Sequence, residues 1–319
     1  MKLIIPVSYF FGKTRSEFWS LNTETKKREK LLTLSDTDRA VRGKGVTGFA
    51  ILDSEYFIAC DFNRLIKIDR QTLKVVSTYE DSEFNDLHSL SVNNGKIYVA
   101  NTGRDSIDIF SDQLKIINRI DSLTTNEWQK RFNGDYTVLG EYFDSTKLGL
   151  PFHRRRGPDK WHFNHVFKAP ESLGGQTIAT SFTARCLFDV NTMQSVSSEL
   201  PRQPHDGFLY GGFIWVTTVS GQIYRALLNL PFEFELVLDL FKVAPYQGWC
   251  RGLNIMDGVM YIGITGIFEL STRTNWLDCP IEETRSGIYQ IKMDSMDVGF
   301  FHDFSSEDGS RIFTMIEDI

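Results

Sequence analysis

The sequence predicts an all-β protein with the fold of a six-bladed β-propeller. Three observations carry this prediction. A unit of four short strands recurs about every 40 residues, most units share one register between a polar residue and an aromatic residue, and each end of the chain supplies part of a further unit. Repetition at this period is typical of propellers, whose blades are four-stranded sheets.

The clearest unit runs from Asp86 to Asp121. It contains an inner strand, an Asn94-Gly95 turn, and strands at Lys96–Ala100, Ser106–Phe110 and Leu114–Arg119. An Asn-Gly pair between alternating apolar segments is a strong signal for a two-residue hairpin. The same pattern recurs in Val46–Glu80, His162–Glu199, Pro204–Leu240 and a unit that begins at Trp249 and ends its outer strands at Ser286–Phe301.

One register relates the units. In four of them a polar residue precedes an aromatic residue of the next strand by ten positions; the pairs are Thr47 with Phe57, His88 with Tyr98, His205 with Trp215, and Arg251 with Tyr261. In the unit that begins at His162 the following loop is longer. The equivalent position there is Asn164 or His165, and the ten-residue spacing cannot distinguish them because the loop length differs.

The spacing of these positions predicts the blade count. Successive gaps from Thr47 to His88, His165, His205 and Arg251 are 41, 77, 40 and 46 residues. The long gap holds one blade plus an inserted loop or helical segment at about residues 122–161, and a seventh blade would require this insertion to be a degenerate blade. We therefore expect a single domain over residues 1–319.

The two ends supply the sixth blade. Strands expected at Leu3–Phe10, Glu17–Asn22 and Glu29–Leu34 lack a preceding inner strand, and Arg311–Ile316 has the pattern of an inner strand without successors. Joining them in one blade closes the ring and removes open sheet edges.

Equivalent positions on the first strands of successive blades would form a ring around the central channel. This ring would hold Thr47, His88, Asn164 or His165, His205 and Arg251. We expect a polar pocket with His88, His205 and Arg251 as catalytic groups, and with Asn164, Thr47, Asp86 and Asp206 as binding or orienting groups. Asp86 and Asp206 adjoin two of the histidines and would fix the tautomer of each ring.

Imidazoles that converge on one cavity also predict a divalent metal. Neutral imidazole is a ligand for zinc, iron or manganese, and the candidate ligands are His88, His162, His165 and His205. Because residues two apart on a strand share a face, His162 and Asn164 point one way and His165 the other. A water-filled channel lined by polar groups that satisfy one another is the alternative.

The composition of the chain limits which partners and which cellular setting we expect. The chain has 319 residues, 35 basic against 41 acidic side chains, and a formal net charge of −6, which argues against nucleic acid as the main partner. No apolar stretch reaches the length of a membrane span. Four cysteines, Cys60, Cys186, Cys250 and Cys279, have no CxxC spacing, so we expect a reducing, cytoplasmic setting.

Five strings together resemble a family of largely uncharacterised bacterial propeller proteins catalogued as a domain of unknown function. They are DLHSL, WHFNH, QPHDG, WCRGLNIMDGVMYIGIT and ETRSGIYQI, and the resemblance covers about residues 84–295. The family has Asp-x-His, His-x-Asn, Pro-His and Arg-Gly-Leu motifs. The resemblance implies a propeller with a pocket formed by His88, His162 with Asn164, His205 and Arg251.

This chain departs from the family at three positions, where Trp161 replaces Cys, His165 replaces Gly and Asp206 replaces Ser. The resemblance makes Asn164 the ring residue and His162 its supporting histidine. It implies no known reaction.

Two classes of function follow from these observations. The first is an enzyme, a hydrolase, lyase or isomerase that acts on a small polar or anionic molecule by histidine or metal-assisted chemistry. The second is a non-catalytic binding module or scaffold for a protein or a glycan, which is a common use of propellers. Fold alone does not decide between them.

Overall fold

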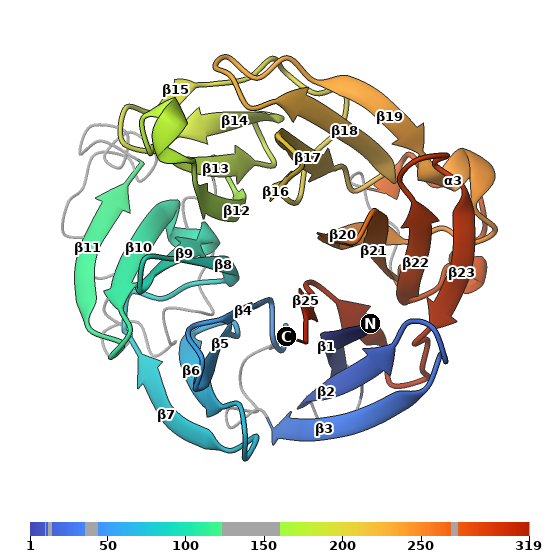
Figure 1. Cartoon of the computed structure of the whole chain (residues 1–319), viewed down its shortest axis with the longest axis horizontal. Coiled ribbons are helices and arrows are strands. Elements are labelled where there is room, and N and C mark those ends of the chain that lie inside the picture. The colour runs from blue at the N-terminus through green and yellow to red at the C-terminus, as the bar shows by residue number, and fades with distance from the viewer. Residues whose placement is uncertain (10, 12–14, 36–43, 123–159, 269–273, 319) are drawn as a thin grey trace. The chain divides into compact units, whose positions relative to one another are not determined.

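The computed structural model describes residues 1–9, 11, 15–35, 44–122, 160–268 and 274–318, and the described strands form six antiparallel sheets (Figure 1). Five sheets have four strands, and the sixth has an additional short one. The predicted six-bladed β-propeller is confirmed. The segment predicted as an insertion, about 122–161, falls almost entirely outside the described residues.

The strands follow the predicted units in order. The N-terminal ones are β1 (Lys2–Tyr9), β2 (Arg15–Asn22) and β3 (Arg28–Ser35). Two complete sheets follow, β4 (Gly48–Ile51), β5 (Tyr56–Cys60), β6 (Arg64–Asp69) and β7 (Val75–Glu80), then β8 (Leu87–Asn93), β9 (Lys96–Asn101), β10 (Ser106–Ser111) and β11 (Ile116–Asp121). The next sheet comprises β12 (Phe163–Lys168), β13 (Thr177–Ser181), β14 (Cys186–Asp189) and β15 (Gln194–Ser195).

Two more sheets and the C-terminal strands complete the fold. They are β16 (Phe208–Tyr210), β17 (Phe213–Thr217), β18 (Gln222–Leu227) and β19 (Glu235–Asp239), then β20 (Trp249–Met256), β21 (Val259–Thr265), β22 (Gly287–Lys292) and β23 (Val298–Asp303), and finally β24 (Ser310–Ile312) and β25 (Ile316–Glu317). A four-residue helix, α3 (Leu240–Val243), follows β19.

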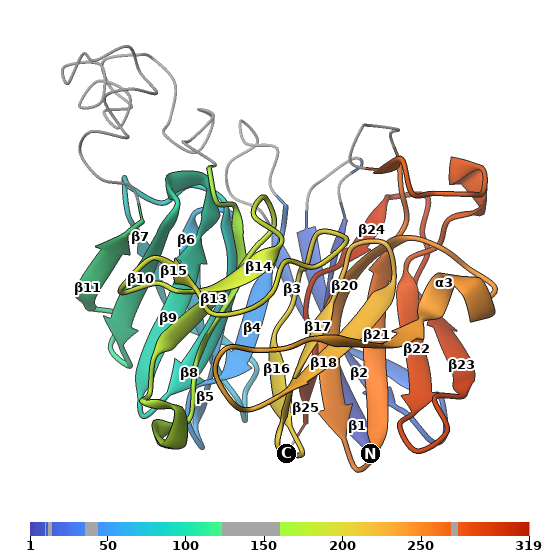
Figure 2. The same cartoon turned by 90° about the horizontal axis from the view of Figure 1, so that it is seen from above.

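The two ends of the chain share one sheet, as predicted. β24 and β25 both pair antiparallel with β1, which continues into β2 and β3. Figure 2 shows β1 and β25 side by side from the edge. The single strand predicted at Arg311–Ile316 is wrong in one respect, because residues 313–315 leave the ladder between β24 and β25.

The predicted hairpin turns form for the predicted reason. Asn94 and Gly95 have φ of 49° and 69°, and they join Asn93 to its partner Lys96. Asp257 and Gly258 repeat this geometry between β20 and β21. Both central residues have positive φ, which matches the twist of the flanking strands and favours Asn, Asp and Gly.

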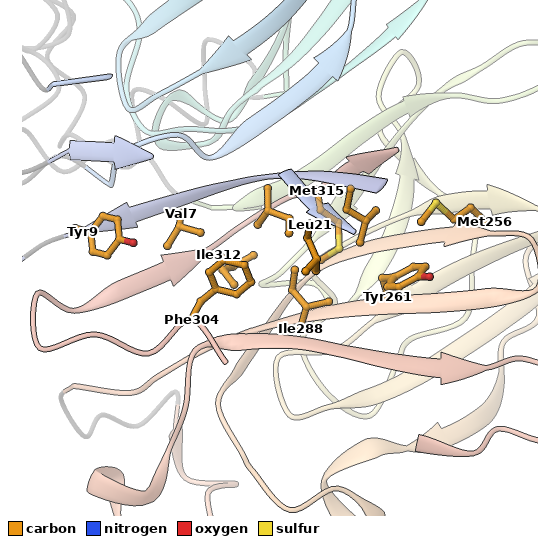
Figure 3. Close-up of a cluster of buried hydrophobic side chains, with 11 residues drawn as sticks. Val7, Tyr9, Leu21, Met256, Tyr261, Ile288, Phe304, Ile312 and Met315 are labelled. Carbon is orange, nitrogen blue, oxygen red and sulfur yellow. The ribbon is translucent and has the colours of Figure 1, made fainter. Parts of the chain in front are cut away.

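Burial depends on the place of a strand in its sheet. All but the first residue of β1 is buried, whereas β7 is exposed at all but one half-buried position. β1 is the second strand of its sheet, beside β24 and β25, whereas β7 is the outermost strand of its own sheet, so the inner strand is covered and the outer one is exposed. Figure 3 shows one resulting cluster, in which Val7, Leu21 and Ile312 of the terminal sheet meet Tyr261 and Ile288 of the β20–β23 sheet.

The described residues divide into two compact units. The first comprises 1–46, 185–187 and 196–319, and the second comprises 47–184 and 188–195. The single domain expected from the sequence stays a prediction. Within the described part of the chain, no helix is long and apolar enough to cross a membrane.

His302 of β23 generates a prediction about stability. Its side chain is buried, and within the described ranges its Nε2 has no hydrogen-bond partner. Burial, together with the positive charges of Lys26 and Arg28, lowers its pKa from 6.5 to about 4. Folding therefore disfavours the protonated ring.

The unfolded chain binds this proton below pH 6.5 while the folded chain does not, so stability falls as the pH drops from 6.5 towards 4. The shift corresponds to about 3 kcal/mol. We expect His302→Gln to remove most of this loss in urea unfolding measured between pH 7 and pH 4. An unchanged pH dependence in the variant would contradict the assignment.

Candidate functional site

The first strands of two sheets in the second unit carry one extra residue at the predicted position. In β8, Leu87 pairs with Asn101 and Ser89 with Ala100, so His88 is left between consecutive pairs. In β12, Phe163 pairs with Ser181 and His165 with Thr180, which leaves Asn164. Each is a β-bulge, a feature that redirects a side chain and is frequent beside active sites.

The first unit repeats this irregularity at His205 and Arg251. Pro204 pairs with Thr218 and Phe208 with Trp215. Between these two pairs the first segment advances by four residues and the second by three. In β20, Cys250 pairs with Ile264 and Leu253 with Ile262, so three steps face two. The extra residue falls within 205–207 in one sheet and within Arg251-Gly252 in the other.

The terminal sheet has the same extra residue. Val7 pairs with Ile312 and Ile4 with Ile316, so four steps on the C-terminal segment face three on β1. Sequence reasoning missed this position, because the sixth unit is split between the chain ends and offers no ten-residue count. Thr47 differs from the others, since it directly precedes the regular pair of Gly48 with Cys60.

The bulges resolve the alternative at His165. Asn164 is the bulged residue and is 1% exposed. His165 lies in the regular ladder, half-buried, with its ring centroid 6.2 Å from that of Phe167. Asn164 is thus the register equivalent of His88, in agreement with the family resemblance.

The second unit brings His88 and His162 together. Their rings meet edge to face with centroids 5.5 Å apart, and both residues are at most 9% exposed. His88 Nδ1 lies 3.7 Å from Asp86 Oδ1. Asp86 and His162 both have positive φ and both stand two residues before a bulged residue, so the chain leads into β8 and β12 in the same way.

Buried polar groups hold the segments that lead into these two strands. The carboxylate of Asp105, which has no exposure, accepts the backbone N–H groups of Lys160, Trp161 and His162. The Thr47 hydroxyl donates to the carbonyl of Leu87 at 2.6 Å. Thr47, predicted to bind a ligand, therefore holds the residue beside His88.

In the first unit, His205 and Asp206 meet through their side chains. His205 Nδ1 lies 3.3 Å from Asp206 Oδ1, and the two residues are 4% and 7% exposed. Consecutive side chains of a regular strand point to opposite faces. The irregular segment before β16 is what lets these neighbours face one another.

Asp206 also joins two sheets. Its Oδ2 accepts a hydrogen bond from the Thr217 hydroxyl at the end of β17, and its Oδ1 accepts the backbone N–H of Gly252 at 3.2 Å. Gly252 follows Arg251 in the bulge of β20. A continuous polar connection therefore runs from the His205 ring through Asp206 to the segment that carries Arg251.

Arg251 is held between two aromatic rings. Its guanidinium carbon lies 5.0 Å from the ring centroid of Trp249 and 4.6 Å from that of Phe313. Arginine stacks on aromatic faces and still presents donors along its edge. The neighbouring thiol of Cys250 is fully buried, and burial raises its pKa well above the usual value, so it is an unreactive core residue.

Two glycines allow the bulge at Arg251. Gly252 has φ of +75°, which side chains rarely adopt, and a Cβ on Gly263 would lie 2.4 Å from the carbonyl oxygen of Arg251. Gly263 faces the bulge from β21. Gly263 was not among the residues predicted from the sequence, although a glycine inside a strand is a known signal of a bulge or of close backbone approach.

Within the described residues, no three His, Cys, Asp or Glu side chains are grouped closely enough to hold a metal ion. The metal set His88, His162, His165 and His205 stays a prediction. So does the single ring of Thr47, His88, Asn164, His205 and Arg251.

The contact at Gly263 predicts the effect of one methyl group. We expect Gly263→Ala to lower the free energy of unfolding by about 1–3 kcal/mol, because the backbone of Arg251 must move away from the new Cβ. Urea unfolding measures this change. Gly266→Ala is the matched control, since its Cβ would meet only an ordinary contact at 3.4 Å. Equal stability of the two variants would contradict the predicted clash.

Three solved structures resemble this chain in fold. A protein of unknown function from Bacteroides caccae has a TM-score of 0.62 and 12% identity over 98% of both chains. A chain of a nidogen/laminin complex has a TM-score of 0.58 and 8% identity, covering 98% of this chain and 97% of that one. A "putative 6-phosphogluconolactonase" from Bacteroides uniformis has a TM-score of 0.54 and 12% identity, covering 97% and 88%.

No family model matches the sequence, and no curated protein matches it. At these identities the likeness to solved structures establishes the fold alone. The chain is a β-propeller whose structural neighbours include an uncharacterised bacterial protein.

Proposed function

We propose that this protein is a hydrolase that acts on a small anionic substrate, with His205 as the general base. The observation that carries the proposal is the connection from His205 through Asp206 to the segment of Arg251. The buried carboxylate accepts hydrogen bonds from two further donors and is thereby fixed in place. A carboxylate fixed in this way orients the imidazole, and an oriented imidazole can act as a general base.

The role of Asp206 follows from its contacts. A carboxylate accepts hydrogen bonds, so the proton of the neutral His205 ring belongs on Nδ1, 3.3 Å from Asp206 Oδ1. The lone pair is then on Nε2. Thr217 and Gly252 hold the carboxylate in place and so preserve the orientation of the ring.

Arg251 supplies the charge that the substrate needs. A guanidinium recognises phosphate or carboxylate with two parallel hydrogen bonds. The rings of Trp249 and Phe313 limit its motion, which lowers the entropy lost when an anion binds. The anionic group of the substrate would bind Arg251, while the reacting carbonyl lies near His205.

The proposed reaction is the opening of an ester by water. Nε2 of His205 accepts a proton from water, and the resulting hydroxide oxygen forms a bond to the carbonyl carbon. The carbon–oxygen bond of the leaving alkoxide then breaks, and the proton passes from His205 to that oxygen. The products are a carboxylic acid and an alcohol, or one hydroxy acid when the ester is cyclic.

A phosphorylated sugar lactone is the first substrate to test. It combines a cyclic ester with an anionic group, which are the two features that His205 and Arg251 would engage. The name given to the Bacteroides uniformis protein suggests the same compound, although that likeness concerns the fold only.

The rate of lactone opening tests this proposal. We expect the full-length protein to accelerate hydrolysis of 6-phosphogluconolactone above the spontaneous rate, and His205→Asn to lower kcat by about 100-fold or more. Asp206→Asn should lower kcat with little change in KM, whereas Arg251→Lys should mainly raise KM. His302→Gln, which removes a buried histidine elsewhere in the same unit, is the matched control.

Lactones without phosphate and small phosphate and carboxylate esters complete the panel. If the protein hydrolyses another anionic ester and this activity depends on His205, the reaction class is supported and that ester takes the place of the lactone as the proposed substrate. No turnover across the panel, or equal rates in the wild type and His205→Asn, would overturn the proposal in favour of a binding module or scaffold.

The metal-assisted form of the reaction has its own test. If a metal binds at the histidines predicted from the sequence, metal analysis of protein purified without an affinity tag should find zinc, iron or manganese in the wild type. A variant with His88→Ala and His205→Ala should lose that metal. Equal and negligible content in both proteins would eliminate the metal and leave acid–base chemistry by the protein alone.

A further inference from the structure

The first unit contains a cleft whose residues take no part in the proposed reaction. It has a volume of about 500 Å³ and lies between the segment that follows β21, the segment that precedes β22 and the segment that leads from β23 into β24. Its lining includes Phe268, Glu282, Arg285, Ser305, Glu307 and Ser310. The volume is in the range of pockets that bind small molecules.

Its two carboxylates are available to a ligand. Neither the Glu282 nor the Glu307 side chain makes an ion pair or hydrogen bond to any described residue, and both residues are exposed. Arg285 also lines the cleft and forms no ion pair with either carboxylate. Its Nη1 donates to the backbone carbonyls of Glu282 and Thr284, and its guanidinium lies over the ring of Tyr246.

Ser310 gives an independent indication of a ligand. The residue is 1% exposed, and its hydroxyl has no hydrogen-bond partner in the described part of the chain. A buried hydroxyl without a partner costs free energy. The hydroxyls of Thr284 and Ser286, which also line the cleft, donate to the carbonyls of Ile281 and Ser310 at 2.6 Å. Ser310 Oγ is therefore the hydroxyl of these three that has no partner among the described residues.

The remaining wall is apolar. Ile267 is buried, while Phe268 is 40% exposed and contacts Phe11 edge to face at 5.2 Å. An exposed aromatic ring beside carboxylates and hydroxyls suits a ligand with a C–H face and a rim of hydroxyl groups. Such a ligand donates to Glu282 and Glu307, accepts from Arg285, and exchanges a hydrogen bond with Ser310.

We propose that this cleft is a carbohydrate-binding site that takes a neutral hexopyranose or the end of a short glycan. A small anion would face two carboxylates, and a small cation would leave the guanidinium and the serine hydroxyls unused. A pyranose ring uses all four kinds of group. The proposal is independent of the lactone reaction, because it shares no residue with the His205 site.

Binding of simple glycosides to the full-length protein tests the proposal. The probes are the methyl glycosides of glucose, galactose and mannose, with cellobiose and lactose, in saturation-transfer NMR and calorimetry. We expect at least one to bind. Phe268→Ala and Glu282→Gln should each weaken it by about ten-fold or more, since each removes a stacking surface or a hydrogen bond to a charged group.

Ser310→Ala separates binding from folding. It removes a buried hydroxyl without a partner, so the free protein should keep or raise its Tm, while glycoside affinity falls several-fold. Phe300→Ala and Glu29→Gln remove exposed side chains of the same types elsewhere in the unit and should leave the affinity unchanged. His205→Asn should also leave it unchanged.

Four results would overturn the proposal. The first three are the absence of binding by every glycoside, binding that survives Phe268→Ala and Glu282→Gln, and binding of choline in preference to the glycosides. Loss of glycoside binding in His205→Asn would place the sugar in the other site and would likewise overturn it.

Discussion

The register of the first strands is the constraint on which the rest of the structure depends. In five of the six sheets, one stretch of the first strand is one residue longer than the stretch of the second strand that it faces. The residues at both ends of the two stretches are paired with each other. That residue cannot join the ladder, so its side chain leaves the regular up-and-down pattern. His88, Asn164 and Arg251 owe their special positions to this extra residue.

The same constraint explains why two buried carboxylates bind backbone N–H groups near these positions. A bulge interrupts the ladder, and the interrupted segments need other partners because they are buried. Asp105 binds three successive N–H groups ahead of Asn164, and Asp206 binds the N–H of Gly252. The Asp206 carboxylate, which would orient His205, thus also binds the backbone of Gly252.

Sequence reasoning predicted the repeat, the blade count and the shared sheet of the two ends, since these depend on local turn residues and on spacing. It also predicted the contact of His205 with Asp206. It placed His88 and His162 among the residues of one pocket but did not predict the direct contact of their rings, because that contact joins two sheets and depends on positive φ at His162. The cleft at Ser310 was equally hidden, since its lining comes from three separate segments and no motif links them.

The pairing of β1 with β24 and β25 has a consequence for biosynthesis. β1 is translated about 300 residues before its partners β24 and β25. Until then the inner edge of an almost fully apolar strand has no backbone partner, which is the condition under which nascent chains associate wrongly. β24 and β25 are therefore needed to complete the hydrogen bonding of β1, and a ribosome that stalls before residue 310 would release a chain in which this edge of β1 is unpaired.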